Sequence, residues 1–178
     1  VRWPGVVEAG SRNENDFVST VDFFRTFLEV AGVSGPPGLD GQSFVPLLKG
    51  QPQTGRSAVF TQIDSKAGGD SVPMRCVQNG KYGYIYNPFS DGKHWYRNNN
   101  EGKSMAAMQE AANTNPEIAA RIELFRYRVP EEFYNLEEDP DCLHNLIDSP
   151  EHAGAIQSLQ ALLHEHLRHT DDPMLAAF

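Results

Sequence analysis

The chain has 178 residues, of which 39% are hydrophobic and 10% aromatic, so it can bury an ordinary core and corresponds to one domain or to one domain plus part of another. Its 24 acidic residues outnumber 15 basic ones, and the net charge of −9 argues against nucleic acid as a partner, because nucleic-acid-binding proteins present a concentrated positive surface. No apolar run approaches the roughly 20 residues of a membrane-spanning helix, so we expect no membrane partner.

The first five residues contain neither an initiator methionine nor the beginning of a signal peptide, which predicts that Val1 is an interior position of a longer protein. The first helix is predicted over residues 17–31, where apolar residues recur at alternating spacings of four and three. Ser19 or Asp22 is expected to cap its start. A connection rich in proline and glycine follows over residues 35–41, and residues 45–48 form a short packed segment.

Short strands are predicted next. Residues 58–60 form one, and Asn79-Gly80 joins Arg75–Val77 to Tyr82–Tyr86 in an antiparallel hairpin, since both turn positions tolerate positive φ. Residues 98–128 predict a helical insertion, and residues 133–136 predict a further strand.

The last helix is expected to begin at Ser149, with Pro150 inside its first turn. Its predicted buried stripe consists of Ile156, Leu159, Leu163 and Leu167. The element order therefore predicts an α+β segment in which a small antiparallel sheet is covered by the carboxy-terminal helix. We assign residues 58–178 to this small domain, with the insertion near 98–128, and residues 1–57 to the end of a larger α/β domain.

No self-sufficient active site is apparent. His164 and His166 lie two positions apart on a helix, so they point about 200° away from each other and do not share a metal; a solvated helix face is favoured for them. The acidic turn around Asp139 lacks the spacing and glycine of an EF-hand, which favours a solvated turn. Cys76 and Cys142 are expected to be structural or incidental, and a disulfide between them stays open.

Basic and aromatic residues near the hairpin are more suggestive. They lie in or beside loops, where they either frame a pocket for an anionic sugar or form scattered surface charge. The set is Lys66, Arg75, Lys81, Lys93, His94, Trp95 and Arg97. Arg75 stands out because a guanidinium on a strand is held rigidly. Arg75, Lys66 and Asp64 are our candidate substrate-binding residues; the alternative for Arg75 is a structural ion pair.

Several motifs in order resemble the sulfatase family over nearly the whole chain. They are Arg2-Trp3-Pro4-Gly5-Val6, Val18 to Leu28 with Ala31-Gly32, Asp40-Gly41-Gln42-Ser43 with Pro46-Leu47-Leu48, Glu132 to Leu136, Asp139-Pro140 and Asn145-Leu146. The family usually has proline at the position of Arg25. Pro73-Met74-Arg75, the long insertion and the stretch from Tyr127 to Tyr134 are most similar to the heparan N-sulfatase (N-sulfoglucosamine sulfohydrolase) branch.

The resemblance implies an alkaline-phosphatase-like fold, in which a large α/β domain bears the active site. A small carboxy-terminal domain contributes a four-stranded antiparallel sheet and a packed helix. The parent enzyme is then expected to hydrolyse sulfate esters or N-sulfate groups of sulfated carbohydrates, with Ca²⁺ and formylglycine as cofactors. A periplasmic, extracellular or lysosomal location would follow from the same resemblance.

Sulfatases make formylglycine within a Cys/Ser-x-Pro/Ala-x-Arg motif, and neither Cys76 nor Cys142 is followed by such residues. We therefore expect this segment to supply no catalytic or metal-binding residue, to bind no cofactor and to be inactive alone. Its expected partner is the amino-terminal catalytic domain of the same chain. Two alternatives stay open: part of a related phosphatase or phosphodiesterase, and a stand-alone carbohydrate-binding or interaction module using Trp95 and Tyr96.

Overall fold

The computed structural model describes residues 1–65, 69, 71–96 and 102–178. Their contacts form two compact units, Val1–Val59 and Phe60–Phe178. Among the helices of the described ranges, none is both long and apolar enough to cross a lipid bilayer. The assignment of residues 1–57 to a larger α/β domain stays a prediction.

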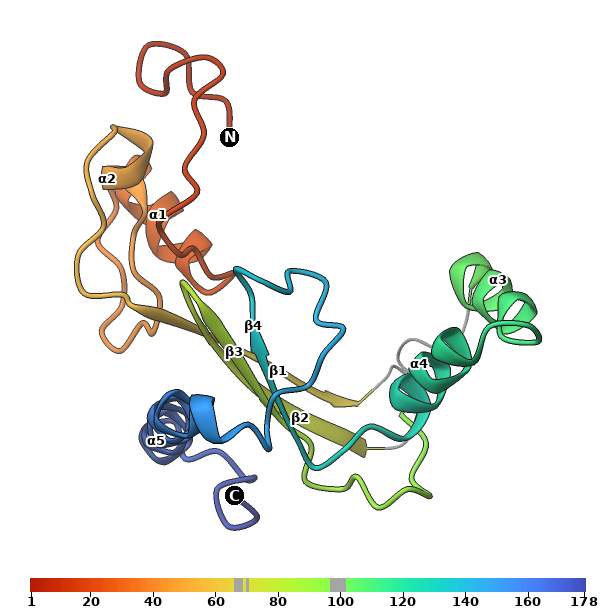
Figure 1. The fold of residues 1–178 in the computed structure, drawn as a ribbon. Helices are drawn as coiled ribbons and strands as arrows, with labels where there is room; N and C mark the ends of the chain where they lie inside the picture. The colour runs from red at the N-terminus through yellow and green to blue at the C-terminus, as the bar shows by residue number, and fades with distance from the viewer. Residues whose placement is uncertain (66–68, 70, 97–101) are drawn as a thin grey trace. The chain divides into compact units, whose positions relative to one another are not determined.

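The first unit contains two helices, α1 (Asp22–Val30) and α2 (Val45–Leu48) (Figure 1). The buried positions of α1 are polar: Asp22 is 0% exposed and Thr26 is 2% exposed. Thr26 Oγ1 accepts a hydrogen bond from Phe44 N at 3.1 Å, which ties α1 to the start of α2. Gly41 lies against the start of α1, where an added Cβ would sit 2.2 Å from Val21 O. A close backbone approach therefore requires this glycine.

The apolar side of α1 faces solvent. Val21, Phe24 and Phe27 are 54%, 52% and 63% exposed. The predicted helix is confirmed, although it begins at Asp22 rather than near Phe17, and within this unit the side chains of Val21, Phe24 and Phe27 remain largely uncovered. Because aromatic side chains gain most from burial, such a face is typical of a surface that packs against another element.

The predicted capping of α1 by a side chain is wrong. Val21 occupies the N-cap position and makes no side-chain hydrogen bond there. Asp22 instead accepts hydrogen bonds from Ser19 N and Gln42 N, and it forms a two-pronged ion pair with Arg56. Burial works to raise the pKa of Asp22, but these hydrogen bonds and the Arg56 charge together lower it.

The second unit is built on a four-stranded sheet in the order β1-β2-β3-β4. Its strands are β1 (Ala58–Ser65), which begins at the end of the first unit, β2 (Ser71–Asn79), β3 (Tyr82–Tyr86) and β4 (Glu131–Asn135). The β2–β3 and β3–β4 pairs are antiparallel. The sheet class expected from the sequence is thus confirmed.

The hairpin between β2 and β3 forms where the sequence predicts it, but for a different reason. Neither Asn79 nor Gly80 has a positive φ. Asn79 Oδ1 instead accepts hydrogen bonds from Lys81 N (2.9 Å) and Tyr82 N (2.7 Å), which closes the turn through a side chain.

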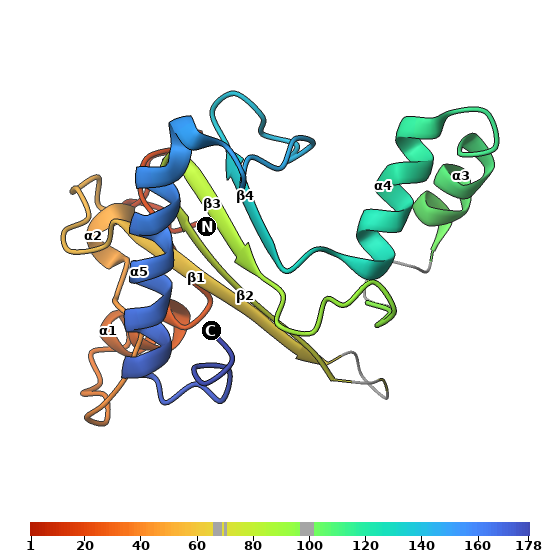
Figure 2. The same ribbon diagram turned by 60° about the horizontal axis from the view of Figure 1, so that its bottom comes forward.

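Helix α5 (Ala153–His169) lies lengthwise over one face of the sheet, against β2 and β3 (Figure 2). Its four buried residues are the predicted Ile156, Leu159, Leu163 and Leu167. The 3₁₀ turn Pro150–His152 precedes it, and Ser149 makes no capping hydrogen bond, so the expected cap is replaced by this turn.

The predicted helical insertion consists of α3 (Lys103–Ala111) and α4 (Pro116–Tyr127). Asn115 caps α4, because its Oδ1 accepts hydrogen bonds from Glu117 N and Ile118 N.

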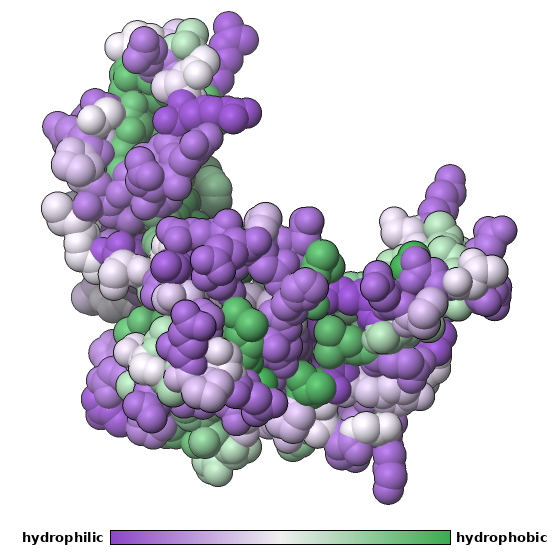
Figure 3. All heavy atoms as spheres, in the orientation of Figure 1, coloured by the Kyte–Doolittle hydropathy of each residue, from purple (hydrophilic) through white to green (hydrophobic). Residues whose placement is uncertain are grey.

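In the space-filling view the visible face of the chain is mostly hydrophilic, and apolar residues appear as separate green patches (Figure 3).

A buried polar cluster joins this insertion to the sheet. Glu132 is 1% exposed and accepts hydrogen bonds from Asn87 Nδ2 (2.9 Å) and Tyr134 Oη (2.7 Å). Arg128 Nη1 lies 3.6 Å from Glu132 Oε1, so the two side chains form an ion pair. The backbone of Arg128 has φ 55° and ψ −173°, a conformation that residues with a side chain rarely adopt. The cluster therefore holds a strained backbone at the junction.

Candidate functional site

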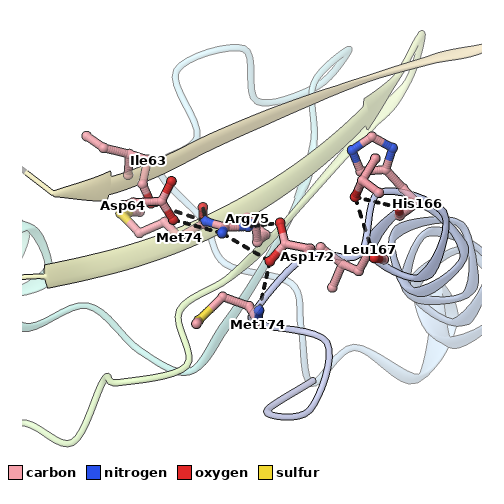
Figure 4. A network of polar contacts seen from close by, with 9 residues as sticks. Ile63, Asp64, Met74, Arg75, His166, Leu167, Asp172 and Met174 are labelled. Carbon is pink, nitrogen blue, oxygen red and sulfur yellow. Dashed lines mark hydrogen bonds and ion pairs between the residues drawn. The ribbon is translucent and has the colours of Figure 1, made fainter. Parts of the chain in front are cut away.

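Arg75 lies near the middle of β2, and its side chain is only 3% exposed (Figure 4). Its Nε donates to Asp172 Oδ2 at 2.8 Å, and its Nη2 donates to Asp172 Oδ1 at 3.1 Å and to Asp64 Oδ1 at 2.8 Å. Its Nη1 donates to the carbonyl oxygens of Ile63 and Met74. A guanidinium has five N–H donors, so every donor of Arg75 has an acceptor within the chain.

The two carboxylates around Arg75 differ in exposure. Asp172 is 6% exposed and Asp64 is 55% exposed. Burial works to raise the pKa of Asp172, but the hydrogen bonds from Arg75 and from Met174 N, with the Arg75 charge, lower it. Burial likewise works to lower the pKa of Arg75, whereas its bonds to Asp172 and Asp64 raise it. The lowered pKa of Asp172 and the raised pKa of Arg75 keep this buried pair charged at neutral pH, and Asp64 is the exposed carboxylate beside it.

This geometry favours the structural alternative for Arg75. A buried guanidinium without a spare donor does not reach a sulfate in this arrangement, whereas Asp64 is accessible and oriented by it. Lys66, the third candidate, lies outside the described residues, and so does Arg97. The assignment of Arg75, Lys66 and Asp64 to substrate binding stays a prediction.

The other basic candidates do not gather around Arg75. Lys81 lies in the β2–β3 turn and pairs with Glu137, whereas Arg75 opposes Tyr86 at the far end of the same hairpin. Lys93 and Trp95 are exposed in the connection between β3 and α3. Among the described members of the predicted set, Arg75, Lys81, Lys93 and Trp95 thus lie on different segments: β2, the β2–β3 turn, and the connection after β3.

The histidines of α5 do not share a single solvated face. His164 and His169 are exposed as expected, but His166 is half-buried and stacks on Phe60 with ring centroids 3.8 Å apart. The acidic turn has a structural function, because Asp139 accepts hydrogen bonds from Leu143 N and His144 N.

Cys76 is not a ready nucleophile. Burial raises the pKa of its thiol, so the reactive thiolate is disfavoured. Cys142 is also a free cysteine, so no disulfide joins the two. Within the described parts of the chain, no three His, Cys, Asp or Glu residues form a group that could hold a metal ion.

Asp172 is the cluster member that the sequence analysis missed. It follows α5 directly and lies 97 residues from Arg75, so no local pattern links the two. The pair Asp22–Arg56 was missed for the same reason. In neither pair does the acidic residue lie near the arginine in the sequence, so no sequence signal pointed to these contacts.

A family model for the carboxy-terminal region of N-sulphoglucosamine sulphohydrolase matches residues 1–124. The chain belongs to this sulfatase family. The small sheet with its packed helix is accordingly the carboxy-terminal part of an alkaline-phosphatase-like fold, as the sequence resemblance implied.

Relatives of this family member are longer proteins. An ulvan-active sulfatase of Formosa agariphila is 29% identical over 160 residues, which cover 89% of this chain and 30% of that protein. The chain thus spans about a third of the length of this curated relative.

Solved structures share the fold. A structure in complex with its substrate D-glucosamine-2-N,6-O-disulfate has a TM-score of 0.64 at 22% identity, over 97% of this chain and 28% of that one. A phosphonate monoester hydrolase of Agrobacterium radiobacter has a TM-score of 0.52 at 18% identity, over 84% of this chain and 24% of that one.

Proposed function

We propose that the chain is the carboxy-terminal part of a sulfatase that hydrolyses sulfate esters or N-sulfate groups of sulfated sugars. The match of the N-sulphoglucosamine sulphohydrolase family model to residues 1–124 carries this proposal. The fold shared with a structure holding a doubly sulfated glucosamine supports a sugar substrate. The nucleophile is supplied by the amino-terminal part of the parent protein.

Ca²⁺ and formylglycine belong to that other part of the parent. There, Ca²⁺ would neutralise the charge of the sulfate oxygens, and formylglycine, a modified residue, would supply the nucleophile that attacks the sulfur. The described residues of this chain do not fit either group. Cys76 is half-buried in β2 and lacks the modification motif, and no metal-holding cluster occurs among the described side chains. We therefore derive no catalytic step from this segment.

The segment contributes packing and substrate recognition. The exposed apolar face of α1, with Phe24 and Phe27, packs against the parent's remaining domain. Asp64 accepts a hydrogen bond from a sugar hydroxyl, because its carboxylate is accessible and has a fixed charged partner in Arg75. Among the described candidate residues, Asp64 is therefore the one that faces the substrate in this proposal, and Arg75 positions it.

The test uses the full-length protein with glucosamine N-sulfate, glucosamine 6-sulfate and a small aryl sulfate. Sulfate release from at least one sulfated glucosamine is expected, with loss of activity after Ca²⁺ chelation and no turnover by the 178-residue chain alone. Turnover by the isolated chain, or a full-length protein inactive on all three substrates, would contradict the proposal.

Phosphoryl or phosphonyl transfer is the second candidate, favoured by the fold shared with a phosphonate monoester hydrolase. An aryl phosphonate monoester in the same assay separates the two: a higher kcat/KM on the phosphonate than on any sulfate would favour the second candidate. A stand-alone carbohydrate-binding module has weaker support, because Trp95 is 44% exposed but Tyr96 is only 2% exposed, so the two rings do not form one solvent-facing platform.

A further inference from the structure

The segment after α5, residues 170–178, folds back onto the sheet; we call it the strap. Asp172 N donates to Leu167 O at 2.9 Å, which turns the chain at the end of the helix. Farther along, Tyr86 Oη donates to Ala177 O, and the Phe178 ring lies 4.9 Å from the Tyr86 ring in an edge-to-face arrangement. The strap is therefore anchored to β3 at its far end as well as to α5 at its start.

Between these two anchors, Asp172 forms an ion pair with Arg75. Both carboxylate oxygens of Asp172 accept hydrogen bonds from the guanidinium, and Oδ1 also accepts one from Met174 N at 2.8 Å (Figure 4). A two-pronged contact fixes the plane of a guanidinium as well as its place. Since Asp172 is only 6% exposed, water competes weakly for these bonds.

The Nη2 atom of Arg75 connects Asp172 to the exposed Asp64 carboxylate. Arg75 Nη2 donates both to Asp172 Oδ1 and to Asp64 Oδ1. The orientation of the guanidinium set by Asp172 therefore determines where Nη2 holds the Asp64 carboxylate. Asp64 itself is 55% exposed, and Arg75 is its only charged partner among the described residues.

We propose that Asp172, carried by the strap, is a positioning residue for substrate recognition, acting through Arg75 on Asp64. The proposal rests on the proposed function, in which Asp64 accepts a hydrogen bond from the sugar. Without Asp172 the guanidinium loses its two-pronged partner, and Asp64 no longer has one fixed position. A charge-assisted hydrogen bond to the sugar then weakens, although Asp64 itself is unchanged.

A double-mutant cycle in the full-length protein tests this, with Asp64→Asn, Asp172→Asn, both together, and Glu165→Gln as control in the exposed Glu165–Arg168 pair of α5. Each single substitution at Asp64 or Asp172 should lower kcat/KM for the sulfated glucosamine about tenfold, the effect of one charge-assisted hydrogen bond. The aryl sulfate should lose much less. The double variant should be no worse than Asp64→Asn, because Asp172 acts through Asp64.

Three results overturn the inference. If Asp64→Asn is impaired but Asp172→Asn is not, the strap has no positioning function while the proposed function survives. Additive losses, or equal losses on both substrates with a lower melting temperature, show that Asp172 is only structural. If Asp64→Asn leaves kcat/KM for the sulfated glucosamine unchanged, Asp64 does not contact the sugar, and both that part of the proposed function and this inference are refuted. Should Asp172→Asn fail to fold, Phe178→Ala loosens the strap at its other anchor and must show the same selective loss.

Discussion

Replacing Arg75 by alanine should destabilise the protein far more than replacing Asp64 by alanine, although both residues share one ion pair. Arg75→Ala leaves the Asp172 carboxylate, 6% exposed, without its partner. Removing one member of a buried ion pair costs about 3–5 kcal/mol, because the remaining charge is left uncompensated. Asp64 is 55% exposed, so its pair with Arg75 is worth about 0–1 kcal/mol.

Urea unfolding at pH 7, followed by circular dichroism, measures this difference, and thermal melts give a second estimate. For a protein of this size, each 1 kcal/mol corresponds to about 2–4 °C, so Arg75→Ala should lower the melting temperature by about 6–20 °C. Arg168→Ala, in the exposed pair on α5, is the matched control and should leave it unchanged. Equal losses for Arg75→Ala and Asp64→Ala would refute the argument from burial.

Four further predictions concern other elements. The folded-state pKa of Asp172 is below its unfolded value, so its contribution to stability is complete above about pH 4 and is lost as pH falls through the folded-state pKa; Asp172→Asn should flatten the acid side of a plot of melting temperature against pH. At Arg128, with φ 55°, the glycine variant should be more stable to urea than the alanine variant by about 1 kcal/mol, and the reverse order would show that the backbone is unstrained. Asn115→Ala should lower the free energy of unfolding by about 1 kcal/mol through loss of the α4 cap, a result that an unchanged urea midpoint would contradict. Phe27→Ser should reduce self-association of the isolated chain in sedimentation velocity, since Phe27 is 63% exposed; unchanged association would exclude the α1 face as its cause.

The sequence alone predicted those elements whose signals are local. The stripe of Ile156, Leu159, Leu163 and Leu167 repeats with the helical period, and the structure buries all four. Asn79-Gly80 marked the hairpin, although the hydrogen bonds come from the Asn79 side chain rather than from positive φ. These features depend on neighbours within a few residues, so one sequence is enough to recognise them. The family resemblance, too, was readable from ordered motifs.

Only the tertiary structure shows which groups Arg75 contacts. From the sequence, Arg75 was a candidate pocket residue with a structural ion pair as the alternative, because an arginine on a strand fits both. The structure brings Asp172 to it across 97 residues and leaves none of its five donors unused. Likewise, helical periodicity marked the apolar stripe of α1 but did not show that its polar side is the buried one. Such pairings depend on how distant elements pack, and the identities of residues along the chain do not specify which distant charges will meet.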